Sequence, residues 1–133
     1  MTIQNNVSAW IERAEEDYTL ARTSLQRKKP LLNGAVFHAQ QCVEKYLKAL
    51  LVFHQLPFPK THDLAALGDL CLQIGVIVPI NEDSLQRLSA YAVEARYPGE
   101  QPSMEDAKDA IETVKSVRGF VRKYLRQHKY RLL

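Results

Sequence analysis

The sequence lacks the features that mark several classes of protein. It has only two cysteines, Cys42 and Cys71, with no CxxC pair and no histidine at metal-ligand spacing, so it carries neither a disulfide framework nor a zinc-finger pattern. No apolar run approaches the ~20 residues that a membrane-spanning helix needs. The polar N-terminus has neither the basic nor the apolar part of a secretion signal. We therefore expect a cytoplasmic protein with buried free thiols, no membrane segment, no metal and no cofactor.

The overall composition of the chain is typical of one globular domain. Hydrophobic residues make up 46% and charged residues 25%, and a chain of 133 residues can bury one ordinary core. Apolar residues recur at spacings of three and four, the period of an amphipathic helix. They predict a single all-α domain over residues 1–133, with its core at about 7–127, folded as an up-and-down bundle of about five helices. We expect these helices at about 7–27, 33–55, 61–74, 81–96 and 103–127.

Polar residues and breakers set the predicted helix ends. Thr61 can serve as an N-cap for the third helix, and Gly75 is a suitable stop after it. Ser103, with Asp106 three residues later, resembles a capping box for the last helix. The apolar, β-branched segment 76–80 has no obvious partner strand, so we interpret it as an extended connection packed on the core.

Charge is distributed unevenly although the net charge is only +3. The stretch 115–133 carries seven basic residues and no acidic one, whereas the first helix begins with acidic residues. A basic stretch can attract phosphate groups. Cations at the end of a helix also complement its dipole, so a solvated helix end explains the same pattern.

Four polar side chains share one face of the second predicted helix. His38, Gln41, Lys45 and Lys48 are spaced by three, four and three. Two lysines, an amide and an imidazole in line suit a phosphate or a nucleotide, because lysine supplies a mobile charge and the other two supply directional hydrogen bonds. An ordinary solvated helix face is the alternative.

Two further positions can contribute to the same site. His62 and Asp63 open the third helix, where backbone N–H groups attract anions and Asp63 can either orient His62 or cap the helix. Arg96 and Tyr97 close the fourth helix. Arg96 can pair inward with a carboxylate such as Asp17 or Glu44, or face a ligand phosphate through its planar fork.

Taken together, three ordered motifs resemble the HEPN domain family (higher eukaryotes and prokaryotes nucleotide-binding). They are the run Gly34-Ala35-Val36-Phe37-His38-Ala39-Gln40-Gln41-Cys42-Val43-Glu44-Lys45-Tyr46-Leu47-Lys48-Ala49-Leu50-Leu51, then Thr61-His62-Asp63-Leu64 with Leu67, and then Ala95-Arg96-Tyr97-Pro98. The resemblance extends from about Ala9 to Tyr124. It implies a helical bundle that is often a homodimer, an association with ATP-like nucleotides or RNA, and, for many prokaryotic members, a minimal nucleotidyltransferase partner in a two-component, toxin–antitoxin-like system.

The same resemblance raises the question of catalysis. Active members of the wider superfamily are metal-independent ribonucleases whose motif is Arg, four to six residues, then His, often followed by x-Tyr, near the start of the final helix. Here Ser103 to Ala110 contains no Arg and no His. The spacing is met at the other end of that helix, by Arg122, His128 and Tyr130.

Three hypotheses follow for the function. The first is a non-catalytic module that binds a nucleotide or contacts a nucleotidyltransferase through Lys45, Lys48, His62, Asp63, Arg96 and Tyr97. The second is a ribonuclease toxin that uses Arg122 and His128, with Tyr130 as a modification site. The third is a dimerisation module without a ligand, in which Trp10, Phe37, Phe53 and Phe58 lie at an interface.

Overall fold

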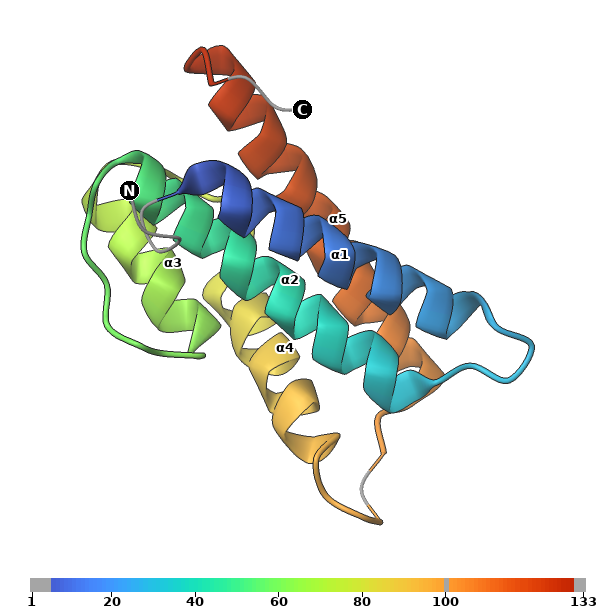
Figure 1. The fold of residues 1–133 in the computed structure, drawn as a ribbon. Helices are drawn as coiled ribbons and strands as arrows, with labels where there is room; N and C mark the ends of the chain where they lie inside the picture. The colour runs from blue at the N-terminus through green and yellow to red at the C-terminus, as the bar shows by residue number, and fades with distance from the viewer. Residues whose placement is uncertain (1–5, 100, 131–133) are drawn as a thin grey trace.

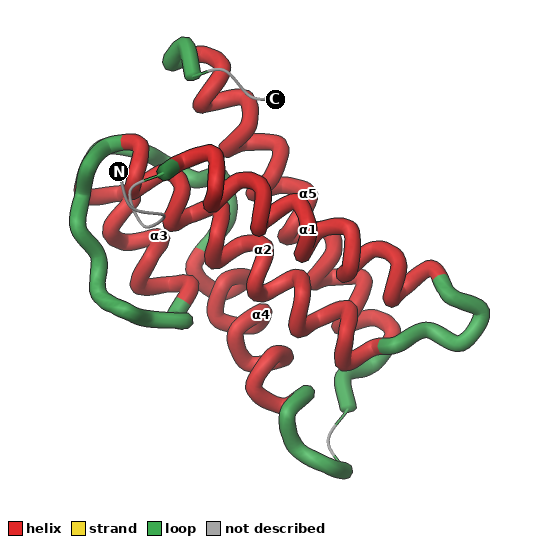
Figure 2. Tube along the Cα trace, viewed as in Figure 1, coloured by secondary structure: helices red, strands yellow, loops and turns green. Residues whose placement is uncertain are grey.

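The computed structural model describes residues 6–99 and 101–130 and shows five helices there. They are α1 (Val7–Gln26), α2 (Leu32–Phe53), α3 (Leu64–Gln73), α4 (Glu82–Glu94) and α5 (Met104–Gln127). The described residues contain no strand, as Figure 2 shows. The predicted all-α fold is confirmed, and none of the described helices is long and apolar enough to cross a membrane.

The helices pack around α2, which contacts all four others. In Figure 1, α1 and α2 form an antiparallel pair joined by the short segment 27–31. The connection 54–63 then runs back along the bundle, so α3 rises in the same direction as α2. The direction alternates again from α3 to α4 and from α4 to α5. This returning connection brings residues 54–63 beside the α1–α2 pair.

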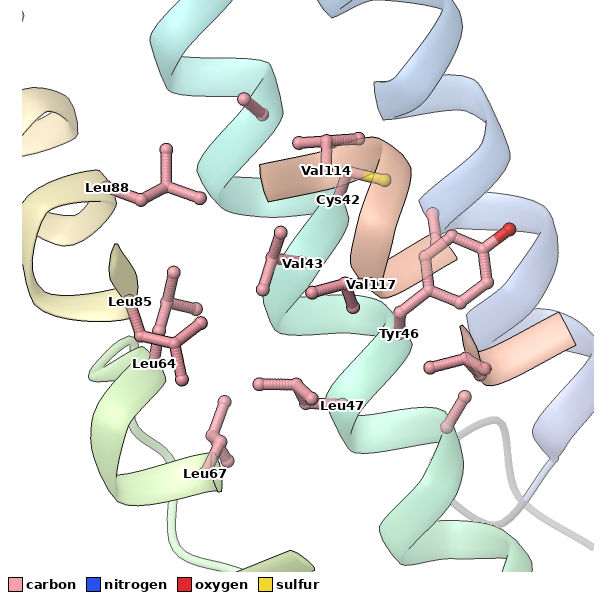
Figure 3. Close-up of a cluster of buried hydrophobic side chains, with 14 of the residues drawn as sticks. Cys42, Val43, Tyr46, Leu47, Leu64, Leu67, Leu85, Leu88, Val114 and Val117 are labelled. Carbon is pink, nitrogen blue, oxygen red and sulfur yellow. The ribbon is translucent and has the colours of Figure 1, made fainter. Parts of the chain in front are cut away.

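The core is built on the apolar sides of α2. Figure 3 shows side chains from α2, α3, α4 and α5 meeting in one cluster, among them Val43, Leu47, Leu64, Leu88 and Val114. These side chains are essentially inaccessible to solvent. Burial of each aliphatic side chain contributes about 1.5–3 kcal/mol relative to exposure. Because α2 is apolar on most of its circumference, it occupies the centre rather than the surface of the bundle.

Caps fix the helix ends, and for α3 the structure decides between the two candidate caps that the sequence offers, Thr61 and Asp63. Asp63, not Thr61, is the N-cap of α3, because its carboxylate accepts the backbone N–H of Ala66 at 3.2 Å. The hydroxyl of Thr61 accepts the N–H of Asp63 instead, at 3.1 Å. The predicted capping box of α5 is confirmed: Ser103 accepts the N–H of Asp106 at 3.0 Å, and Asp106 accepts the N–H of Ser103 at 3.1 Å.

Two predictions about the interior are also confirmed. Cys42 and Cys71 are buried free thiols, and burial raises the pKa of the Cys71 thiol to about 12. The segment 76–80 is an extended connection rather than a strand, with Val76 buried and Ile77 exposed. Gly75 precedes it with φ of +80°, a conformation that glycine adopts without strain.

Candidate functional site

Asp17 of α1 is a buried carboxylate that holds two of the predicted site residues. His38 Nδ1 donates to one oxygen of Asp17 at 2.8 Å, and Lys45 Nζ donates to the other. Both donors lie on α2, so the contact crosses the α1–α2 interface. A buried carboxylate is costly unless its charge is paired and hydrogen-bonded. His38 and Lys45, two of the polar side chains on this face of α2, therefore join α2 to α1.

Glu44 of α2 is a second buried carboxylate, and it holds two more of the predicted site residues, Lys48 and His62. Lys48 Nζ donates to Oε2 at 3.1 Å, whereas His62 Nδ1 donates to Oε1 at 2.8 Å. Gln40 also donates to Oε1, at 3.3 Å. The three donors come from one face of α2 and from the segment before α3. Lys48 supplies a positive charge opposite Glu44, and the hydrogen bonds from His62 and Gln40 complete the set, so the approach of residues 54–63 to the bundle is fixed.

Two glutamines extend the network around His62. Gln41 Nε2 donates to Gln40 Oε1 at 2.8 Å, and Gln40 Nε2 donates to the backbone carbonyl of His62 at 3.0 Å. Gln40 is buried, as is Glu44. His62 is thus held through its backbone by Gln40 and through its ring by Glu44, although its side chain is 72% exposed.

Glu15 forms a third charged cluster, between α1 and α5. Arg118 and Tyr46 donate hydrogen bonds to it, and Arg122 Nη1 lies 3.7 Å from Oε1. Burial raises the pKa of Glu15, but the hydrogen bonds from Arg118 and Tyr46 and the nearby arginine charges outweigh it, so the net pKa is lowered. Burial and the Glu15 hydrogen bond raise the pKa of Tyr46 well above its usual range.

A groove of about 1090 Å³ opens between the start of α1, the end of α2 and residues 55–60. Trp10 and Phe58 meet edge to face there, with ring centroids 6.3 Å apart. The ammonium of Lys48 lies 5.6 Å from the Trp10 centroid and 5.7 Å from that of Phe58, within the range of cation–π attraction. The groove is lined by Val7, Trp10, Lys48, Val52, Phe53, Gln55, Leu56, Pro57, Phe58, Lys60 and Tyr130.

An aromatic cluster lies where the C-terminal end of α5 meets the end of α2. His54 Nε2 lies 2.7 Å from the Tyr124 hydroxyl, and the His128 ring stacks on Tyr124 with centroids 4.0 Å apart. His128 Nδ1 donates to the Tyr124 carbonyl at 2.9 Å. Burial, followed by the charge of His128, lowers the pKa of His54. The Tyr130 hydroxyl hydrogen-bonds to Ser8 of α1.

Comparison with known proteins identifies the family. A sequence profile of the HEPN domain matches residues 7–124. The chain belongs to the HEPN family. A Methanocaldococcus jannaschii protein named "Putative toxin MJ1304" is 26% identical in an alignment that covers 92% of this chain and 90% of that protein. The crystal structure of ST0689, described as an archaeal HEPN homologue, matches with a TM-score of 0.65 at 23% identity, over 90% of this chain and 98% of that one. This structural likeness shows a shared fold.

Within this HEPN domain, the predicted nucleotide-binding residues separate into groups. His38 and Lys45 share Asp17, whereas Lys48 and His62 share Glu44. Gln41 acts indirectly, through Gln40. This face of α2 therefore carries ion pairs to two buried carboxylates, Asp17 from the neighbouring helix α1 and Glu44 from α2 itself.

Two pairings that the sequence left open as alternatives do not form. Asp63 does not orient His62, because the Asp63 carboxylate caps α3 and the His62 ring donates its hydrogen bond to Glu44. Arg96 does not pair with Asp17 or Glu44, whose oxygens are held by other donors. Arg96 and Tyr97 are instead exposed at the end of α4, and Arg96 makes no side-chain ion pair within residues 6–99 and 101–130.

The three residues of the ribonuclease hypothesis have separate partners within one chain. Arg122 faces Glu15 of α1, His128 stacks on Tyr124, and Tyr130 bonds to Ser8. No sequence motif marks the groove, because Trp10 lies far along the chain from Phe58 and Lys60. The aromatic and basic side chains of these residues suit a ligand site, but only the fold shows that they lie in one groove.

Proposed function

We propose that this HEPN-domain protein binds a nucleotide in the groove beside Trp10 and Phe58 and acts with a minimal nucleotidyltransferase. The observation that carries the proposal is that one groove is lined by the edge-to-face pair of Trp10 and Phe58 and by Lys60. A nucleotide needs a π-face for its base and positive charge for its phosphates, and the groove offers both.

The two lysines of the groove have different roles in this proposal. Lys48 is buried and paired with Glu44, so its charge is largely balanced and it serves to position the aromatic rings. Lys60 is exposed and makes no ion pair among the described residues. We therefore assign phosphate contact to Lys60, as a mobile cation on the rim of the groove.

The partner and the assembly are inferred from the family. A relative that carries the name of a toxin supports a role in a toxin–antitoxin-like pair, in which a nucleotidyltransferase would be the second component. The exposed end of α4, with Arg96 and Tyr97, supplies a surface for that contact because Tyr and Arg are enriched at protein interfaces. A homodimer and an RNA ligand belong to the same proposal.

The single tryptophan provides a direct assay. Titration with ATP is expected to change Trp10 fluorescence in the full chain, with a midpoint that gives the Kd. Phe58→Ala removes one stacking face and is expected to weaken binding about tenfold. Lys60→Ala is expected to weaken binding more at low salt than at high salt, because its contribution is electrostatic.

Lys28→Ala is the matched control for Lys60→Ala. Lys28 is exposed in the connection between α1 and α2, at the opposite end of α2 from the groove. An unchanged Kd for Lys28→Ala, together with a larger Kd for Lys60→Ala, supports nucleotide binding in the groove. Fluorescence that does not respond to ATP, ADP or AMP contradicts nucleotide binding at Trp10, and failure to co-purify with a nucleotidyltransferase contradicts the partnership.

The toxin-named relative also favours a second candidate, a metal-independent ribonuclease. Arg122 and His128 have different partners within one chain, so a shared phosphate would have to lie between two copies. The test is cleavage of RNA in EDTA by the wild type and His128→Ala. Cleavage that disappears in the variant supports this candidate, whereas equal activity or none in either contradicts it.

A further inference from the structure

His62 combines an exposed ring with a fixed position. Its side chain is 72% exposed, yet its Nδ1 donates to the buried carboxylate of Glu44 at 2.8 Å. Its backbone carbonyl accepts from buried Gln40 at 3.0 Å. Ordering an exposed side chain costs rotamer entropy, and here two buried polar groups supply the compensating hydrogen bonds. The consequence is that one particular ring atom, Nε2, is presented to solvent in a defined direction.

The partner of Nδ1 decides the chemistry of Nε2. Glu44 also accepts from Lys48, so it is held as a carboxylate and can only accept hydrogen bonds. Nδ1 therefore carries the proton, and Nε2 of the neutral ring carries a lone pair. A carboxylate that fixes the tautomer and stabilises a cationic ring is the usual support of a nucleophilic or basic histidine.

The other histidines lack this combination. His54 Nε2 is occupied by the Tyr124 hydroxyl, and His128 stacks on the Tyr124 ring with its Nδ1 on a backbone carbonyl. His38 has a carboxylate partner, but its side chain is only 27% exposed and lies at the α1–α2 interface. Among the four histidines, His62 alone joins a buried carboxylate partner to a mostly exposed ring.

His62 also lies beside the groove. Glu44 holds the His62 ring with one oxygen and the Lys48 ammonium with the other. That ammonium lines the groove over Trp10, and Lys60 of the groove rim is two residues before His62. Phosphates drawn to this rim would come close to Nε2, the ring nitrogen of His62 that Glu44 does not hold.

We propose that His62 is a phosphoryl-accepting nucleophile, which takes the terminal phosphoryl group of a nucleoside triphosphate at Nε2. The proposal rests on the proposed function, because the groove supplies the nucleotide. The Nε2 lone pair forms the N–P bond as the bond between the terminal phosphorus and its bridging oxygen breaks. The nucleoside diphosphate leaves with that electron pair. The Nδ1 proton stays in place, and Glu44 balances the positive charge that develops on the ring.

A first experiment tests the nucleophile without a nucleotide. The full chain is treated with phosphoramidate, and phosphohistidine is assigned by ³¹P NMR and mass spectrometry. We expect His62 to react faster than His54 and His128, and only at Nε2, because Nδ1 is blocked. Glu44→Gln, checked for folding by circular dichroism, is expected to slow labelling of His62 roughly tenfold. Equal labelling of the exposed histidines overturns the proposal.

A second experiment tests the donor. Incubation with γ-labelled MgATP is expected to give an acid-labile label that mass spectrometry places at His62, that is lost in His62→Gln and that is kept in His54→Gln. Absence of label in the wild type overturns the proposal, whatever phosphoramidate shows. The Trp10 titration with ATP, run in parallel, shows whether nucleotide binding has failed as well or whether only the transfer has failed.

Discussion

Arg118 of α5 donates two hydrogen bonds to Glu15 of α1, from Nε at 2.7 Å and from Nη2 at 2.8 Å. Its guanidinium carbon lies 4.4 Å from the ring centroid of Tyr18, one helical turn along α1. The planar fork thus contacts a carboxylate at its edge and an aromatic ring on its face. This pair connects the first and the last helix of the domain.

Arg118→Lys is expected to lower the free energy of unfolding by about 1 kcal/mol, because lysine cannot form the two parallel hydrogen bonds or stack its charge in the same way. The expected loss is small because both side chains are 31% exposed, so that solvent screens the ion pair. Urea unfolding followed by circular dichroism measures the change. Arg126→Lys, at an exposed position near the end of the same helix, is the control and is expected to have no effect.

Glu15 is expected to make stability depend on acid pH. Its folded-state pKa lies below the ordinary value of 4.5, so its contribution is fully present above about pH 4.5 and is lost as the pH falls through the lower folded-state pKa. Glu15→Gln should be less stable at pH 7 and should lose less stability between pH 4.5 and pH 3. Glu16→Gln, exposed on the same helix, should follow the wild-type profile.

Leu47→Ala is expected to destabilise the domain by about 2–5 kcal/mol, because it leaves a cavity at the centre of the core. Leu47 is fully buried on α2. Leu72→Ala removes the same atoms from a side chain that is 59% exposed, so it should change the unfolding free energy by less than about 0.5 kcal/mol. Similar losses for both variants would contradict the position of the core.

Ser103→Ala tests the capping box of α5. It removes the oxygen that accepts the N–H of Asp106, and we expect a loss of about 1 kcal/mol. Ser116 is solvent-exposed in the middle of the same helix. Ser116→Ala should leave the stability unchanged or raise it slightly, because alanine has the higher helix propensity. Thermal unfolding of the two variants side by side gives the comparison, and equal melting temperatures would argue against the cap.

Helix positions could be predicted from the sequence because apolar spacing and polar caps are local signals. The capping box of Ser103 and Asp106 is predictable for this reason, and the structure confirms it. Both Thr61 and Asp63 are candidate caps of α3 in the sequence, and the sequence does not decide between them, since the two polar side chains compete for the same N–H groups and their rotamers decide. Both candidate caps are local, so the choice between them moves the start of α3 by two residues and leaves the fold unchanged.

The candidate site was harder to predict because its partners are far apart in the sequence. The polar stripe of α2 was visible, but its pairing depends on how α1 is rotated against it. Asp17 was an alternative partner for Arg96 in the sequence, and it holds His38 and Lys45 in the structure. The pairing of Arg118 with Glu15 spans 103 positions and has no local signal.

The central place of α2 has a consequence for how the molecule opens. Every other helix rests on α2, so its backbone amides should exchange with deuterated solvent only when the whole domain unfolds. The short α3 and α4, which lie on one side of it, can detach while the α1–α2 pair persists. Native-state hydrogen exchange would then separate a slow unit of α1, α2 and α5 from a faster unit of α3 and α4. His62, which begins the approach to α3 but is held by α2, lies at the boundary between the two.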